Sequence, residues 1–318
     1  MLRVLALYYS QTGQLRRALE SLLAGLDPNE FEVHVEAIRP VEDYPFPWPF
    51  GEFLDVFPEC VLGHVPEIQK PGFDPDADYD LIVLGYTVWF LAPSLPMQGF
   101  LKSEYARVLR GKSVTTLIAC RNMWHTASER MKRDLTAAGA ELRDNVVVTD
   151  EGPAWATFVT TPRWMFTGRK DRFWKVFPPA GVSADSIDGL RRFGEAITQN
   201  RGDLDSRPGG PLLTGLGAIE IDNRMVVPEL LGRVLFQPWS RLVAITGERG
   251  GRVRRFTLYL FFTNLVLTVL ILVPISVIVR LLLYPLLRAP LQAYVGRLKA
   301  PSGATSRDNL APPVHDSQ

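Results

Sequence analysis

The sequence predicts an α/β protein with a doubly wound, parallel five-stranded sheet. Short apolar runs alternate with amphipathic segments over roughly the first half of the chain. Two of these runs, Leu2–Tyr9 and Asp80–Val88, are almost continuously apolar, which is typical of parallel strands buried on both faces. Parallel strands need crossover helices, and helical patterns lie between the runs. A ligand site is therefore expected at the carboxyl ends of the strands.

Each expected element follows from its own periodicity. Leu15, Ala18, Leu19 and Leu22 keep the spacing of one helix face, so a helix is expected over Gln14–Leu26. Alternation of apolar residues predicts a strand over Phe31–Ala37. The remaining elements are expected as a helix, a strand, a helix and a strand over Met97–Leu109, Ser113–Ala119, Thr126–Ala138 and around Val146–Val148.

Two connections are long and rich in aromatic residues. They cover residues 40–79 and 151–182, inside a domain expected over residues 1–200. Long loops in compact domains are often functional, and this aromatic content argues against disorder. They are expected either to pack against the sheet edge or to form an apolar lid over a ligand and a lipid-like substrate.

Composition excludes several classes of function. The formal net charge is +1, which argues against a general nucleic-acid binder. The two cysteines, Cys60 and Cys120, form no C-x-x-C motif, so neither a disulfide framework nor a zinc site is expected. The four histidines show no metal-ligand spacing, and we expect no metal.

The C-terminal third predicts a membrane anchor. Residues 201–255 are interpreted as a linker with amphipathic segments that could lie on a membrane surface. The run Phe256–Val279 has no charged side chain and is long enough to cross a bilayer, so a transmembrane or anchor segment is expected over residues 256–287. A single span and a hairpin anchor both stay open. Residues 288–318 are expected to form an interfacial segment and a disordered tail.

Arginines crowd the N-terminal flank of this run. Arg249, Arg252, Arg254 and Arg255 precede it, whereas Arg280 and Arg288 follow it more sparsely. Because positive charge favours the cytoplasmic side, the large domain is expected on the cytoplasmic face of the cytoplasmic membrane.

The first strand–helix junction carries the sharpest functional signal. Leu2–Tyr9 is followed by a hydroxyl-x-hydroxyl-Gly motif and at once by a helix. Hydroxyls, free backbone N–H groups and the positive end of the helix dipole converge there, as a phosphate requires. The alternative is an ordinary turn. The predicted phosphate-binding residues are Ser10, Gln11, Thr12, Gly13, Gln14 and Leu15.

Two later strand ends complete a site for a flavin such as FMN. Aromatic side chains after the strand ending near Tyr86 could stack on a flat ring, and a polar loop after Ala119 could bond its pyrimidine edge. The expected cofactor-binding residues are Thr87, Val88, Trp89, Phe90, Cys120 and Asn122. Arg121 is the candidate for stabilising negative charge as hydride arrives, and His125 is the candidate proton acceptor or else a structural residue.

Residues 1 to about 200 resemble the flavodoxin-like/NAD(P)H dehydrogenase superfamily. More narrowly, the segments YYSQTGQL, PFPWPF…FLDVFPE, DLIVLGYTVWFLAPSLPMQGFL, ACRNMW and WMFTGRKDR resemble the dialkylresorcinol condensing enzyme family. The resemblance implies an FMN-dependent aromatase that oxidises a dialkyl-cyclohexanedione, made by a partner ketosynthase, to a dialkylresorcinol in lipid or aryl-polyene-type biosynthesis. Flavodoxins usually place Asn-Thr after the loop glycine; Gln14 and Leu15 stand there instead.

Two alternatives to the aromatase stay open. The same site could reduce quinones with NAD(P)H at a membrane. A non-catalytic, membrane-tethered scaffold that recruits the ketosynthase is the other, and the missing phosphate hydroxyl supports it. A homodimer also stays open.

Overall fold

The computed structural model contains the expected five-stranded parallel sheet. It describes residues 1–205 and 209–302, with side chains for all of these except 205 and 272–287. The strand order is β2-β1-β3-β6-β7, formed by Phe31–Ala37, Leu2–Tyr8, Leu81–Tyr86, Ser113–Cys120 and Glu141–Thr149. In order along the chain this is 2-1-3-4-5, the order of flavodoxin-like doubly wound sheets. The predicted fold class is confirmed.

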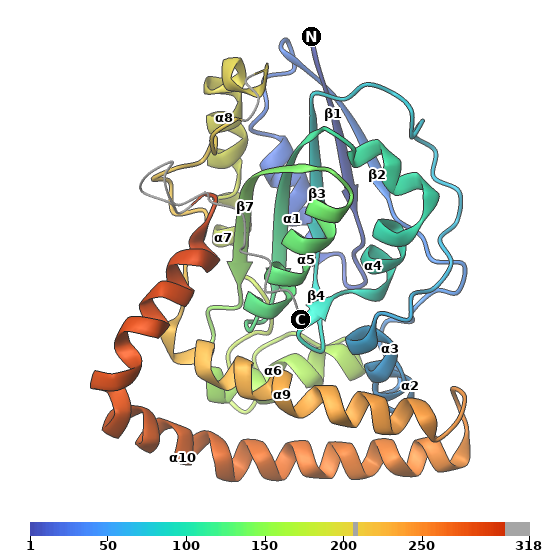
Figure 1. Cartoon of the computed structure of the whole chain (residues 1–318), viewed down its shortest axis with the longest axis vertical. Helices are drawn as coiled ribbons and strands as arrows, with labels where there is room; N and C mark the ends of the chain where they lie inside the picture. The colour runs from blue at the N-terminus through green and yellow to red at the C-terminus, as the bar shows by residue number, and fades with distance from the viewer. Residues whose placement is uncertain (206–208, 303–318) are drawn as a thin grey trace.

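Helices cover both faces of the sheet (Figure 1). Side chains alternate along β1, so Val4 and Ala6 face one core while Leu5 and Leu7 face the other. The first core is closed by α1 (Gln14–Leu23), α7 (Ala184–Asp188) and α8 (Arg191–Gln199).

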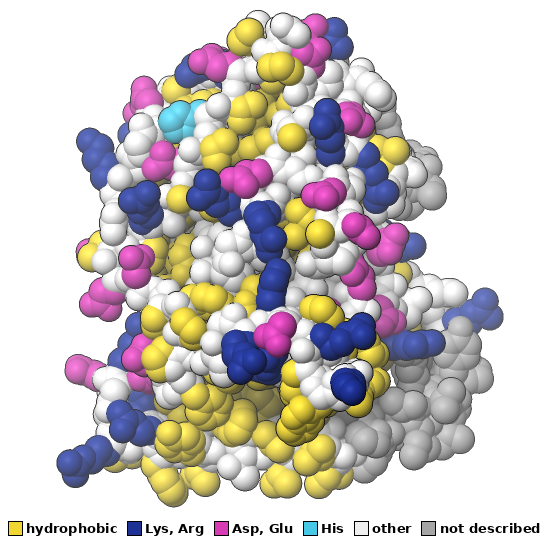
Figure 2. Space-filling model, turned by 180° about the vertical axis from the view of Figure 1, so that it is seen from behind, with side chains coloured by type: hydrophobic (Ala, Val, Ile, Leu, Met, Phe, Trp, Pro, Cys, Tyr) yellow, Lys and Arg dark blue, Asp and Glu magenta, His cyan; other side chains and the backbone are white. Residues whose placement is uncertain are grey.

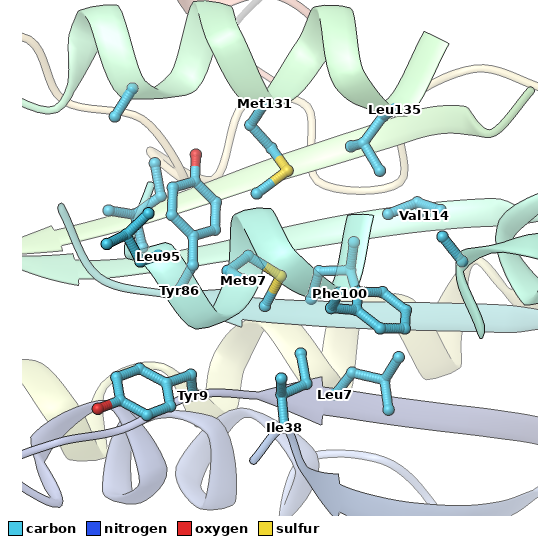
Figure 3. Packing of buried hydrophobic residues seen from close by; sticks show 14 of the residues in the cluster. Leu7, Tyr9, Ile38, Tyr86, Leu95, Met97, Phe100, Val114, Met131 and Leu135 are labelled. Carbon is cyan, nitrogen blue, oxygen red and sulfur yellow. The ribbon is translucent and has the colours of Figure 1, made fainter. Parts of the chain in front are cut away.

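The second core is closed by α4 (Leu95–Lys102) and α5 (His125–Ala137). Tyr86, Met97 and Met131 meet there between the strands and these two helices (Figure 3). Both faces of the central strands β3 and β6 are therefore buried, whereas the edge strand β2 is largely exposed. A ligand site is expected at the strand ends.

Some element boundaries differ from expectation. The helix expected over Met97–Leu109 is divided into α4 and a short 3-10 helix, η1 (Glu104–Leu109). Ser103 is extended, and both its N–H and its hydroxyl donate to Phe100 O, which ends α4. The strand expected through Val88 stops at Tyr86 because residues 88–93 form a small hairpin, β4 (Val88–Trp89) and β5 (Ala92–Pro93).

The two aromatic connections contain helices. Residues 40–79 hold α2 (Phe50–Asp55) and α3 (Phe57–Leu62), and residues 151–182 hold α6 (Ala154–Thr167). Their rings pack on one another: Phe166 of α6 meets both Phe50 and Phe53 of α2 at centroid distances of 5.3 and 5.4 Å. The helices α2, α3 and α6 of these connections lie at the carboxyl end of the sheet (Figure 1).

The C-terminal third continues around the same domain. After η2 (Arg201–Asp205), residues 209–219 pack on the outer strand, where Val147 N donates to Ala218 O at 2.9 Å. Helix α9 (Asn223–Ile245) then crosses the carboxyl end of the sheet, and α10 (Arg252–Lys299) runs beneath it (Figure 1). Within the part of the chain that the structure describes, Arg252–Ile271 is one stretch long and apolar enough to cross a membrane. The tail expected to be disordered falls mostly on residues 303–318, outside the described residues.

Candidate functional site

The loop between β1 and α1 leaves room for an anion. Gly13 is the N-cap of α1, has a φ of +77°, and makes no side-chain cap hydrogen bond. A Cβ added at Gly13 would meet nothing within 4 Å. The amides of the first turn are held only loosely: Gln14 N donates to Thr12 Oγ1 and Arg16 N to Ser10 Oγ, both at 3.4 Å. Two hydroxyls, several N–H groups and a helix dipole thus converge on open space.

Three of the predicted phosphate residues have side chains committed elsewhere. Gln11 Nε2 donates to Pro45 O at 2.8 Å, and Leu15 is buried in the core under β1. The buried side chain of Gln14 accepts a hydrogen bond from Val182 N at 2.8 Å. Only the backbone N–H groups of these residues remain for an anion. Gln14 therefore does not replace the hydroxyl that flavodoxins place after the glycine; it ties the loop to the segment after α6.

The segment after β3 is built differently from expectation. Trp89 is 7% exposed and lies among three aromatic rings, those of Tyr9, Tyr44 and Trp48, at centroid distances of 5.7, 5.0 and 4.7 Å. The indole contributes to the core because the long connection over residues 40–79 folds back onto it.

Phe90 is also engaged. It stands at the turn of the β4–β5 hairpin with a φ of +48°, a left-handed conformation that favours glycine. Its ring stacks on Phe53 at 4.7 Å and meets Phe57 at 5.3 Å. Thr87 and Val88 lead into the hairpin, where Ser94 N donates to Thr87 O. The four residues predicted here, Thr87, Val88, Trp89 and Phe90, therefore lie beside the aromatic connection over residues 40–79.

The loop after β6 supplies a buried cation. Arg121 Nε donates to Thr157 Oγ1 at 2.9 Å, and its guanidinium lies 3.9 Å above the ring of Phe158. The Nη2 atom is buried and has no hydrogen-bond partner. Burial lowers the pKa of Arg121 to about 10, so the group stays charged at neutral pH. An unpartnered buried donor on a cation is costly unless an acceptor arrives.

Cys120 and Asn122 flank Arg121 in this loop. Cys120 is buried, and burial raises the pKa of its thiol far above the usual range, so it stays neutral. Its Sγ lies 3.8 Å from Asn122 O, and Asn122 is half-buried. Neither residue supplies a charge to the site.

Helix α6 faces these loops with a polar stripe. Thr157, Thr160 and Thr161 share one helix face, and the Oγ1 atoms of Thr160 and Thr161 are buried without a partner. One end of the stripe meets Arg121 through Thr157. At the other end, a Cβ at Gly181 would collide with Gln14 Oε1 and with the ring of Trp164, at 2.9 Å from the ring.

Thr157 thus links α6 to the β6 loop, and Trp164 lies at the other end of the helix near Gly181 and Gln14. Sequence analysis missed these threonines, because the aromatic residues around them dominate the pattern. The signal was three hydroxyls at helical spacing inside an otherwise apolar segment.

His125 lies at the first position of α5, next to this loop. Its Nδ1 is 2.7 Å from Oε2 of Glu229 on α9, with exposed side-chain fractions of 3% and 0%. The two side chains lie within ion-pair distance, but no aligned hydrogen bond joins Nδ1 and Oε2. Glu229 Oε1 accepts from Thr126 N and Thr126 Oγ1 at 2.6 and 2.8 Å. A carboxylate thus caps the positive end of α5.

Glu229 was also missed by the sequence analysis. It is the one carboxylate in the segment Asn223–Ile245. A lone carboxylate among apolar residues was the sequence signal that could have indicated a buried, paired side chain.

A cavity of about 800 Å³ lies nearby but does not suit a phosphate. It is bordered by Tyr44, Trp48 and Arg249, and also by carboxylates, namely Glu42, Asp43, Glu52, Asp55, Glu59 and Glu67. This negative lining would repel an anion. Among the described residues, no group of three or more His, Cys, Asp or Glu side chains is arranged to hold a metal.

Searches against known proteins give structural neighbours only. No family model and no curated protein matches the sequence. A flavoprotein from Lactobacillus acidophilus NCFM, solved in complex with FMN, is 19% identical, with a TM-score of 0.39, over 46% of this chain and 93% of that one.

Two flavodoxins give similar values. A flavodoxin from the domain Archaea is 11% identical (TM-score 0.35, 63% and 98% covered), and a WrbA-like flavodoxin from Agrobacterium tumefaciens is 10% identical (TM-score 0.35, 63% and 97% covered). The assignment of the fold rests on the strand order described above: this chain has the flavodoxin-like fold.

Proposed function

We propose that the protein is an FMN-dependent oxidoreductase that acts on an apolar, lipid-like substrate. The observation that carries this proposal is the open cradle at the start of α1, formed by Ser10, Thr12 and Gly13. It lies at the junction where the flavodoxin-like fold is expected to bind a ligand. The unpartnered donors of α6 and Arg121 face the same end of the sheet and suit an anionic, hydrogen-bonding ligand.

The residues that would hold the cofactor divide into two groups. The hydroxyls of Ser10 and Thr12 and the first amides of α1 would bind the phosphate. Thr160, Thr161 and Arg121 would donate hydrogen bonds to polar atoms of the cofactor beyond its phosphate. When bound, FMN supplies a two-electron acceptor for hydride. Arg121 would stabilise the negative charge that accompanies reduction, which is effective because the guanidinium is shielded from water.

A chain of aromatic contacts supports a lipid-like substrate. Phe262 of α10 meets Phe50 at 4.9 Å, Phe50 meets Phe166 of α6 at 5.3 Å, and Phe53 links Phe166 to Phe90. A continuous cluster of aromatic rings thus connects the C-terminal helices with the β4–β5 turn. Alkyl chains bury favourably against such a cluster, at about 0.8 kcal/mol per methylene.

The specific reaction we propose is the aromatisation of a dialkyl-cyclohexanedione to a dialkylresorcinol. In that reaction the substrate ring loses one hydride and one proton. His125 is the candidate that receives the proton: Glu229 stands beside Nδ1, which leaves Nε2 as the nitrogen with a free lone pair. The ketosynthase partner, the homodimer and the cytoplasmic orientation remain predictions.

Anaerobic assays of the full chain with added FMN separate the alternatives. We expect the dione to bleach the flavin absorption and to yield the resorcinol, identified by mass. Bleaching by NADPH with reoxidation by a quinone, and no reaction with the dione, would instead establish a quinone reductase. Retained cellular function after Thr12→Leu, with no flavin bound, would establish a scaffold.

A further inference from the structure

Both ends of α10 are attached to the α/β domain. At its N-terminal end, Arg254 is 3% exposed and donates to Asp55 Oδ1 at 2.5 Å and to both carboxylate oxygens of Glu59 at 2.8 Å. At its C-terminal end, Leu298 is fully buried, and Lys132 of α5 donates to Leu298 O at 3.3 Å. Just beyond the helix, Ser302 accepts from Asn145 N of β7 at 2.7 Å.

These attachments are incompatible with a single membrane crossing. A crossing would place the two ends of the apolar segment on opposite sides of a hydrocarbon core about 30 Å thick. Arg254 and Leu298 contact the same domain, which lies on one side only. A hairpin anchor would need two opposed legs within the apolar run, whereas α10 is one helix throughout. The first part of the helix instead follows the base of the domain beside α9, and its last part bends upward along the side of the domain (Figure 1).

The outward surface of this helix pair is apolar. Only 22% of the hydrophobic window in Arg252–Ile271 is buried, so α10 is not a core helix. Hydrophobic side chains gather at this end of the molecule (Figure 2). The exposed apolar residues are Leu231, Val234, Leu242 and Ile245 on α9 and Val253, Phe256, Tyr259, Leu260, Val266, Leu267, Leu270 and Ile271 on α10.

The charge around this surface is positive. Arg233, Arg241, Arg252 and Arg255 are exposed on the two helices. Over residues 223–271 the acidic residues are the buried Glu229 and the exposed Glu248. Apolar residues beside exposed arginines are the pattern of a helix that lies in the headgroup region of an anionic bilayer.

We propose that α9 and the first part of α10, residues 223–271, form an in-plane docking surface for an anionic lipid bilayer. The domain then rests on one leaflet, and no segment of α10 crosses to the other side. The apolar run that predicts a span in the sequence serves as a surface anchor because both of its flanks bind the domain. This proposal does not depend on the flavin, and its test uses none.

Flotation of the full chain with lipid vesicles tests the docking surface. We expect binding to phosphatidylcholine vesicles that contain phosphatidylglycerol and weaker binding to vesicles without it. Val234→Glu with Leu270→Glu should reduce bound protein about tenfold or more, since both side chains are largely exposed and the fold does not need them. Val35→Glu, at an exposed position on β2, is the matched control and should bind as the unmodified protein does.

Labelling tests the in-plane orientation. In inverted membrane vesicles, Glu248→Cys and Arg288→Cys should both react with a membrane-impermeant maleimide added outside. Both positions are exposed, and they flank the apolar run. Reaction of one of them only after detergent would establish a span and overturn the proposal. A protein that sediments as a dimer, stays dimeric when vesicles are added and does not float with them would assign the surface to a second copy of the chain. That result would also overturn the proposal.

Discussion

Oε2 of Glu229 on α9 and Nδ1 of His125 on α5 lie 2.7 Å apart in the interior of the protein. Glu229 also contacts Thr126, the next residue after His125, from which it is 103 positions away in the sequence. The pair joins the C-terminal helices to the loop that carries Arg121. A carboxylate in this position stabilises the start of α5 and lies beside the His125 imidazole. The C-terminal helices are therefore part of the folded unit that contains the candidate site.

Removing this carboxylate should destabilise the whole domain. We expect Glu229→Ala to lower the free energy of unfolding by about 3 kcal/mol, because it leaves His125 and the Thr126 N–H buried without a partner. Glu229→Gln keeps an acceptor for Thr126 and should lose about 1 kcal/mol. Urea unfolding measures both. Glu195→Ala, in the exposed pair with Arg191, is the control and should change stability little. Equal losses for Glu229→Ala and the control would contradict this account of the pair.

Thr12 should contribute directly to cofactor affinity. Replacing it by Val removes one hydroxyl at nearly constant volume, and a hydrogen bond to a charged group is worth roughly 1.5–3 kcal/mol. We expect Kd for FMN to rise about tenfold or more, measured by quenching of flavin fluorescence. Thr136→Val removes a hydroxyl from α5, where it bonds only Lys132 O, and should leave Kd unchanged. A Kd that is the same for both variants would place the phosphate elsewhere.

Arg121 should set the redox potential of bound FMN. Arg121→Met removes the buried charge that favours the reduced, more negative cofactor. The two-electron midpoint potential should fall by about 30 mV or more, which is a tenfold change in the equilibrium. Arg121→Lys keeps a charge and should show a smaller fall. If neither substitution changed the midpoint potential of bound FMN, Arg121 would not be part of the flavin site.

Asp144 should make stability depend on pH. It is buried on β7 and accepts from Leu212 N and Leu213 N at 2.8 and 3.1 Å. Burial nevertheless raises its pKa from 3.8 to about 6. Between those values the folded state binds a proton that the unfolded state does not, so stability falls as the pH rises from about 4 through 6.

The expected size of this change is on the order of 3 kcal/mol, at 1.36 kcal/mol per pKa unit. Urea unfolding across this pH range measures it. Asp144→Asn cannot ionise and should show a flatter profile over the same range. A variant whose pH profile parallels that of the unmodified protein would assign the dependence to another group.

The central sheet was predictable because its strands carry their own signal. Val4–Leu7 of β1 and Leu81–Tyr86 of β3 are buried on both faces, so each shows a continuous apolar run that needs no partner to be recognised. The cradle at Gly13 was predictable for the same reason, since its residues are adjacent in sequence.

The rest of the site depends on contacts between distant segments. Trp89 packs against Tyr44 and Trp48 of the preceding connection, and the local sequence does not indicate these contacts. Thr160 and Glu229 reach the site from α6 and α9, and only the folded chain brings these helices to the strand ends. The apolar run of α10 predicts a span by its length, whereas its flanking contacts, which local sequence does not reveal, attach it to the domain.

The central claim, a flavin phosphate bound at the start of α1, is tested most directly by titrating the purified full chain with FMN. The visible spectrum, the flavin fluorescence and the mass of the bound chromophore are recorded together. The account predicts saturable binding of one FMN per chain, with quenched fluorescence, that riboflavin reproduces only weakly because it lacks the phosphate. Equal affinity for riboflavin and FMN, or no binding of either, would contradict it.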